Sequence, residues 1–260
     1  MTIQAQILPH RSGTGAANMA LDEALLDEVA AHKAFAYIRT YEWSIPTLSL
    51  GYFQSLNEAL TESRFRSVPI VRRPTGGGAL WHDREITYAV VIPADHPLAR
   101  QTKTFYRAVH EALANVIRPH GLPIDRRGDV SNRLVEIGHQ ETRTGSRPFL
   151  CFTDRDPEDL VSGRFKLVGS AQRRRAGAVL QHGSVLLGRS DVTPELPGLT
   201  DLIAEKALDL HYLRMDAIAT AIARSLQLTT QFSELPDRVR LRATELESSI
   251  YSNPEWTGRR

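Results

Sequence analysis

The stretch VPIVRRPTGGGALWHDREITYAVVIP, residues 68–93, carries the most informative backbone pattern in this chain. Its first six residues are typical of a buried strand, and its last nine predict the next strand. Between the two lie three consecutive glycines, Gly76, Gly77 and Gly78. The pattern predicts a strand, a glycine loop and a second strand.

The patterns on either side of this unit alternate between strand and helix. Leu21, Leu25 and Val29 recur at helical spacing with acidic residues between them, which predicts an amphipathic helix. Residues 125–147 predict a strand with long loops. The remaining periodicities and turn signals predict strands at 3–8, 35–43, 47–53, 148–152, 159–171 (a hairpin around Ser162-Gly163) and 178–187, and helices at 15–32, 57–64, 104–117, 215–228 and 234–251.

Length and composition describe a folded chain of ordinary type. The 260 residues are 42% hydrophobic, enough for a sizeable core, and no repeat or flexible linker divides them. Helices at both ends of a strand-rich middle predict a single α+β domain over residues 1–260. The 32 basic residues are nearly balanced by 30 acidic ones, so we expect no nucleic-acid partner.

The single cysteine, Cys151, excludes an internal disulfide. The first residues lack the basic and apolar order of a signal peptide, and no apolar run approaches the length of a membrane span. We therefore expect a cytoplasmic protein that does not enter a membrane.

One segment concentrates positive charge. Arg164, Lys166, Arg173, Arg174 and Arg175 follow one another without an acidic residue, directly after a run of four acidic residues. Such charge runs are commonly solvated turns. The alternative is a docking face for an acidic protein or a phosphate.

The glycine loop is a candidate binding element. Glycines lack a Cβ, so main-chain N–H groups can approach a ligand closely, and Arg72 and Arg73 add charged donors. The spacing of a P-loop and the GxGxxG pattern are both absent. Glycine count alone fits a tight turn equally well, and the arginine pair favours a ligand.

Cys151 and Lys166 form a candidate catalytic pair. A cysteine beside apolar residues is more often a small buried side chain than a nucleophile. However, Lys166 is flanked by Phe165 and Leu167 and should face away from them. If residues 148–152 pair with this hairpin, the ammonium can favour the thiolate and hold a carbonyl oxygen. Such a pair suits acyl transfer.

Other catalytic classes lack their signatures. The nine histidines are dispersed, and only His82-Asp83 forms a close pair, so we expect no metal site. A GxSxG elbow is absent, which excludes the usual serine hydrolases. His182 is either a base, a donor that orients substrate or a histidine satisfied within the core.

The sequence resembles the biotin/lipoate protein-ligase superfamily, in its lipoate ligase and octanoyltransferase branch. The resemblance rests on NMALDEALL, RTYEWSIPTLSLGYFQ, RRPTGGGALWHDREITY, GRFKLVGSAQRRRAGAVLQHGSVLL and YSNPEWT. It implies a mixed, mostly antiparallel sheet flanked by helices, with a smaller second sheet. It also implies that Lys166 contacts an acyl carbonyl and that the following residues bind substrate: Arg72, Arg73, Thr75, Gly76, Gly77, Gly78, Ala79, His82, Gly169, Ser170, Ala171 and His182.

The two branches of this family differ in chemistry. Lipoate ligases activate a free acid with ATP and Mg²⁺, whereas cysteine-type octanoyltransferases need no such cofactor. The latter move octanoate from acyl carrier protein through an enzyme thioester to glycine-cleavage H protein or a lipoyl domain. Cys151 and the segment 151–184 resemble the transferases, while Gly78 departs from them, because many carry arginine there. We expect a transferase with a ligase as the alternative, and the presence of both Cys151 and Lys166 argues against a non-enzymatic binding subunit.

Overall fold

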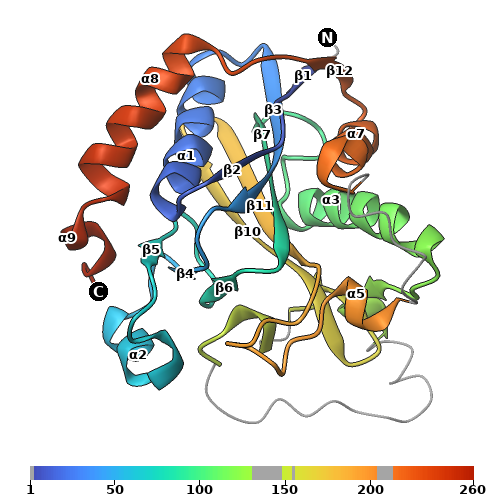
Figure 1. Ribbon diagram of the computed structural model, residues 1–260. Coiled ribbons are helices and arrows are strands. Elements are labelled where there is room, and N and C mark those ends of the chain that lie inside the picture. The colour runs from blue at the N-terminus through green and yellow to red at the C-terminus, as the bar shows by residue number, and fades with distance from the viewer. Residues whose placement is uncertain (1–2, 131–147, 154–155, 204–212) are drawn as a thin grey trace.

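The computed structural model describes residues 3–130, 148–153, 156–203 and 213–260. Within these ranges the chain forms a nine-stranded mixed sheet and a three-stranded sheet, with helices on both faces of the large one (Figure 1). The expected α+β architecture with a smaller second sheet is confirmed.

The large sheet is parallel at one edge and antiparallel through the rest. β1 pairs in parallel with β12 and β3, and β2 with β3, whereas every other neighbouring pair is antiparallel. Helix α1 lies between β1 and β3 in the chain, and a helical crossover permits parallel pairing. The order is β12 (Thr229–Phe232), β1 (Gln4–Ile7), β3 (Phe35–Trp43), β7 (Glu85–Pro93), β11 (Ala178–Leu186), β10 (Phe165–Arg175), β9 (Leu160–Ser162) and β8 (Asp125–Arg126), with β2 (Arg11–Gly13) on β3.

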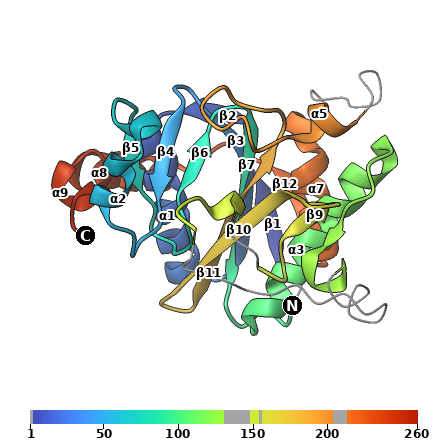
Figure 2. The ribbon, with the colours of Figure 1, turned by 90° about the horizontal axis from the view of Figure 1, so that it is seen from below.

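The small sheet holds the glycine loop. Its order is β5 (Ile70–Arg72), β4 (Thr47–Leu50) and β6 (Leu80–His82), and it lies beside the large sheet (Figure 2). The two-strand interpretation of residues 68–93 is therefore wrong. A third strand, β6, follows the glycines, and β5 and β7 belong to different sheets. The strand is only three residues long, too short to show alternation.

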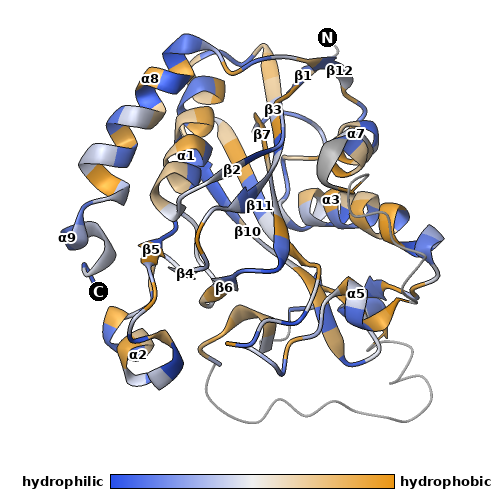
Figure 3. Ribbon diagram, in the orientation of Figure 1, coloured by the Kyte–Doolittle hydropathy of each residue, from blue (hydrophilic) through white to orange (hydrophobic). Residues whose placement is uncertain are grey.

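Two helical layers cover the large sheet. α1 (Gly15–Ala31) and α8 (Asp237–Leu246) lie on one face, and α3 (Thr102–Ile117) and α7 (Ile218–Ser225) on the other (Figure 1). Hydrophobic and hydrophilic residues alternate along α3, as an amphipathic helix requires (Figure 3). The short elements are α2 (Leu56–Thr61), α5 (Leu199–Leu202), α9 (Pro254–Thr257), the 3₁₀ turns Ser63–Phe65, Arg118–His120 and Cys151–Thr153, and the π turns Leu213–Ala217 and Glu247–Tyr251.

Helix α1 is not amphipathic in the expected sense. Asp22, Glu23 and Glu28 are all buried, although acidic residues predict a solvated face. Arginines neutralise these carboxylates: Arg39 on β3 pairs with Asp22, which faces the sheet, and Arg238 on α8 pairs with Glu28 at 2.5 Å. Burial of paired charges explains why the sequence pattern misled.

The expectation of a strand at 148–152 is also wrong. Leu150 forms a single bridge with Ala79, and Cys151 then begins a 3₁₀ turn. Phe152 holds this turn by packing with Leu80 and Leu186. Strand β12 was missed as well. Residues 131–147 of the predicted strand-and-loop region lie outside the described residues, and none of the described helices is long and apolar enough to span a membrane.

Candidate active site

Cys151 is fastened to the glycine loop by its main chain. Its N–H donates to the Ala79 carbonyl at 2.8 Å, and the Ala79 N–H donates to the Phe149 carbonyl at 2.9 Å. A Cβ on Gly78 would lie only 2.9 Å from the Cys151 nitrogen. This close approach of two backbones requires glycine at position 78.

Lys166 on β10 approaches Cys151 from the large sheet. Its Nζ lies 3.5 Å from the Cys151 Sγ and donates to the Cys151 carbonyl at 2.9 Å. A Cβ on Gly169 would lie 2.6 Å from the Lys166 Cε, so this glycine leaves room for the lysine stem. The predicted proximity of thiol and ammonium is confirmed, although residues 148–152 do not pair with the hairpin.

The Lys166 ammonium also forms a buried ion pair with Asp159, at 2.9 Å. Burial alone would lower the pKa of Lys166, but Cys151 and Asp159 outweigh it and raise that pKa. Burial raises the pKa of Asp159 to about 6, although Lys166 opposes this shift. The lysine is therefore a cation at neutral pH.

Two cavities meet at Cys151. Five residues line both: Gly76, Gly77, Cys151, Ser170 and Ala171. The first, called the apolar cavity, is otherwise lined by Met19, Tyr41, Trp43, Arg73, Leu80, His82, Thr87, Gly169, His182, Gly183 and Ser184. The second, called the polar cavity, is otherwise lined by Gly78, Tyr106, His110, Asp156, Glu158, Asp159, Lys166 and Gln172. The thiol thus lies between an apolar and a polar space.

A buried chain of hydrogen bonds includes His182 and Tyr41, which line the apolar cavity. His182 donates from Nδ1 to Asp22 at 2.8 Å, and its Nε2 lies 2.7 Å from the Thr75 hydroxyl. Asp22 also accepts from Arg39 and Tyr41. Although burial opposes it, Arg39 and His182 hold the pKa of Asp22 below its usual value. His182 therefore ties the glycine loop to α1.

His82 belongs to a second buried network. Its Nδ1 lies 2.9 Å from Glu85, its Nε2 lies 2.6 Å from the Ser49 hydroxyl, and its ring stacks on Trp43. Burial lowers the pKa of His82 despite the carboxylate of Glu85. The side chain presents a ring to the apolar cavity and keeps its polar atoms bonded to protein.

The two arginines before the glycine loop differ from the expectation that both offer donors to a ligand. Arg72 is fully buried, lines neither cavity, and donates to main-chain carbonyls that include those of Gly51 and Thr257. It joins the loop to the C-terminal segment. Arg73 donates to the carbonyls of Ser49 and Gly78, each at 2.7 Å, so it holds the glycine loop against β4.

Helix α3 contributes a further polar group that sequence reasoning missed. His110 lies with Nδ1 2.5 Å from the Glu158 carbonyl and Nε2 2.5 Å from the Ser170 hydroxyl, which also bonds the Tyr88 hydroxyl. Burial lowers the pKa of His110 to about 4. The imidazole is neutral, so Nδ1 donates to the carbonyl and Nε2 accepts from Ser170.

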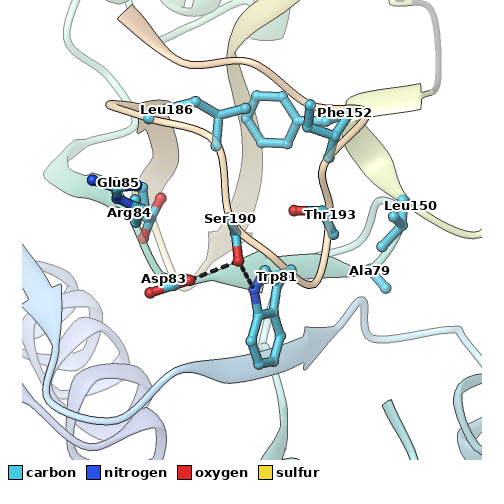
Figure 4. Close-up of a pocket in the computed structure, with 12 residues that line it drawn as sticks. Ala79, Trp81, Asp83, Arg84, Glu85, Leu150, Phe152, Leu186, Ser190 and Thr193 are labelled. Atoms are coloured by element: carbon cyan, nitrogen blue, oxygen red, sulfur yellow. Dashed lines mark hydrogen bonds between the residues drawn. The ribbon is translucent and has the colours of Figure 1, made fainter. Parts of the chain in front are cut away.

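A separate pocket is lined by Leu150 and Phe152, the neighbours of Cys151 in the chain (Figure 4). Ser190 bridges Asp83 and Trp81, donating to the first at 2.6 Å and accepting from the second at 2.9 Å. Phe152 and the predicted binding residue Ala79 line this pocket. Neither Cys151 nor Lys166 lines it, so it is a supporting feature rather than part of the site.

The structure thus brings most of the predicted residues to one place. Among the described residues, no three His, Cys, Asp or Glu side chains are grouped as a metal ion requires. Sequence reasoning missed Asp22, Asp159 and His110. Asp159 lay in an acidic run that reads as solvated, Asp22 in a helix that reads as amphipathic, and nothing in the sequence distinguishes His110.

A thiol beside a buried ammonium, where an apolar and a polar cavity meet, is an arrangement that suits an enzyme of acyl transfer. The sequence matches the lipoyl protein ligase A/B catalytic domain family over residues 14–196, and the chain belongs to this family. It is 41% identical over 215 residues to octanoyltransferase LipM of Moorella thermoacetica, covering 81% of this chain and 76% of that protein. It is 32% identical over 267 residues to octanoyltransferase LipM of Brevibacillus brevis, covering 94% and 95% respectively.

Solved structures agree on the fold. A putative lipoate protein ligase from T. acidophilum with bound lipoic acid superposes with a TM-score of 0.75 at 21% identity, over 100% of both chains. Lipoate-protein ligase A bound with ATP superposes with a TM-score of 0.73, over 99% of both chains, also at 21% identity.

Proposed function

We propose that this enzyme moves an octanoyl group from octanoyl-acyl carrier protein through a Cys151 thioester to a lysine of a lipoyl-accepting protein. The acceptor is glycine-cleavage H protein or a lipoyl domain of a dehydrogenase. The observation that carries the proposal is the 3.5 Å approach of the Lys166 ammonium to the thiol where the two cavities meet. Relatives named octanoyltransferase LipM, 41% and 32% identical to this chain, support the choice of acyl group.

In the first step the Cys151 thiolate attacks the thioester carbonyl of the donor. The bond between that carbonyl and the carrier thiol breaks, the carrier sulfur takes a proton, and octanoyl-Cys151 remains. The apolar cavity suits the octanoyl chain because aromatic and aliphatic side chains line it. Lys166 stabilises the oxyanion of the tetrahedral intermediate.

In the second step a neutral amine of the acceptor enters through the polar cavity and attacks the enzyme thioester. A carbon–nitrogen bond forms, the bond to Cys151 breaks, and the amine loses one proton as the amide forms. Because the thioester is already activated, the reaction needs neither ATP nor Mg²⁺. A reducing cytoplasm would keep the single cysteine available as a thiol.

Intact-mass spectrometry tests this proposal. Octanoyl-acyl carrier protein alone should leave one octanoyl group on the enzyme, removable by neutral hydroxylamine, and Cys151→Ala should leave none. Adding apo H protein should transfer the group without ATP. If the enzyme stays unlabelled and the acceptor is modified only from free octanoate with ATP and Mg²⁺, the protein is a ligase instead.

A further inference from the structure

All three N–H bonds of the Lys166 ammonium have an acceptor on Asp159 or Cys151, and we call these three residues the cluster. Nζ donates to the Asp159 carboxylate at 2.9 Å, to the Cys151 carbonyl at 2.9 Å, and to the Cys151 sulfur at 3.5 Å. The Lys166 side chain is 2% exposed and that of Asp159 is 5% exposed. Water therefore competes little for the ammonium, and these contacts fix its direction.

Asp159 is itself held in place. Its second carboxylate oxygen accepts the main-chain N–H of Asp156 at 2.9 Å, in the turn that leads into β9. β9 pairs with β10, and Val161 lies opposite Lys166. Asp159 directly precedes β9 and Lys166 lies on β10, so one hairpin holds both partners of the ion pair.

The charges around the cluster are few. From the turn before β9, Asp156 and Glu158 face it, and Glu158 is paired with Arg107 and Arg126. From α3 come Tyr106 and His110, of which the histidine is neutral. Tyr88 on β7 forms a hydrogen bond with Ser170. Arg73 precedes the glycine loop, and burial lowers its pKa to about 10. Among the described residues, Asp159 is the carboxylate that contacts Lys166.

The Asp159 carboxylate neutralises the positive charge of Lys166 while the Cys151 thiol is still protonated. When the thiol ionises, its negative charge is therefore stabilised less than it would be beside an unpaired ammonium. Without the Asp159 charge, the thiolate would become the anion that this buried ammonium contacts. A charge change within a few ångströms shifts an ionisation by about one to three pH units.

We propose that Asp159 completes a Cys151–Lys166–Asp159 triad as a positioning residue. It aims the Lys166 ammonium at the thiol and, by neutralising that ammonium, restrains thiolate formation. The inference rests on the proposed roles of Cys151 and Lys166. It concerns thiol reactivity, which can be measured without any acyl donor.

Alkylation by iodoacetamide as a function of pH tests it, because Cys151 is the single cysteine of the chain. We expect Asp159→Asn to move the alkylation midpoint down by about one pH unit or more. Asp159→Glu keeps the charge and should stay near the wild-type midpoint. Asp156→Asn removes a carboxylate from the same turn without breaking the ion pair, and should shift the midpoint less than Asp159→Asn does.

Octanoyl transfer supplies the second readout. Asp159→Asn should lose at least about tenfold in transfer rate, because the ammonium is no longer aimed, and Asp159→Glu should recover part of it. A folded Asp159→Asn protein with the wild-type alkylation midpoint, or a higher one, overturns the proposal. If Asp159→Asn does not fold, Asp159→Ser takes its place: a lowered midpoint with slowed transfer supports the proposal, and a wild-type midpoint overturns it. Absence of an acyl-enzyme in the wild type would instead contradict the proposed function.

Discussion

Lys166 is the residue whose chemistry depends most on its surroundings. Its ammonium is buried, yet it is bonded to a carboxylate, a carbonyl and a sulfur, so the cost of removing it from water is offset locally. Phe152 adds an aromatic face 5.3 Å from Nζ. A single side chain therefore links Cys151 to the large sheet.

Substitution of Lys166 by methionine should separate chemistry from folding. Methionine keeps much of the stem volume and removes the charge, so we expect octanoyl transfer to fall by at least about 10²-fold, the scale of one lost oxyanion donor. Arginine should not restore the rate, because a planar guanidinium does not fit the place of a compact ammonium. Circular dichroism would check the fold, and a folded Lys166→Met protein with transfer within a few-fold of wild type would remove Lys166 from the mechanism.

At the scale of elements, periodicity predicted helices and long strands well and short pieces poorly. The 9-residue strands β3, β7 and β11 and the helix α3 follow directly from their apolar patterns. Strand β6 and the Cys151 turn span three residues each, and tertiary contacts define them. The Cys151–Lys166 pair could be predicted because a strand alternation and a resemblance both indicated it, whereas Asp159 required the register of β9 against β10.

Helix α3 is joined to the β9–β10 hairpin through His110, and this junction predicts a pH effect on stability. The pKa of His110 is about 4 in the folded protein, below the value of about 6.5 in an unfolded chain. As pH falls from 6.5 towards 4, His110 becomes protonated in the unfolded chain but stays neutral in the folded protein. Stability is therefore complete above about pH 6.5 and declines below it.

Between pH 7 and pH 5 the wild type should lose about 2 kcal/mol more unfolding free energy than His110→Gln. Urea denaturation at both pH values would measure this difference. His32→Gln, which removes an exposed histidine, is the matched control. Equal losses in wild type and His110→Gln would show that the imidazole is not held neutral.

At the scale of the whole molecule, the fold regroups the basic residues that the sequence placed together. Arg175 forms ion pairs with Glu23 and Asp27 on α1 and is therefore not free to bind a partner. Arg173 instead lies over the Tyr52 ring, 5.3 Å from its centre, and two residues from the C-terminal segment join it. Arg259 lies over Tyr52 and Arg260 over Phe53, at 4.4 and 5.8 Å. No linear pattern could predict this cluster.

These three arginines, called the mouth arginines, should assist docking of an acidic donor protein. Phe53 is 71% exposed and lies beside Gly76, which lines both cavities. No carboxylate side chain in the described part of the chain forms an ion pair with the mouth arginines. Replacing all three by glutamine should lower kcat/KM for octanoyl-acyl carrier protein about tenfold and weaken its salt dependence, with kcat little changed.

Arg240→Gln is the matched control, since Arg240 is exposed on α8 and pairs with Asp237. Steady-state kinetics at two ionic strengths would compare the variants. If the triple variant keeps the wild-type kcat/KM and salt slope, the mouth arginines are a solvated surface and the donor docks elsewhere.

The contact between Gly78 and Cys151 also constrains how the sequence can change over evolutionary time. A side chain at position 78 cannot be accommodated by a rotamer change, because the atoms it would meet belong to the backbone of Phe149 and Cys151. Any lineage that replaces Gly78 must move the segment that carries Cys151 beforehand or at the same time. Positions 78 and 149–151 should therefore vary together among descendants of this protein. A substitution at Gly78 alone should disrupt the packing of the Cys151 segment and be lost by selection.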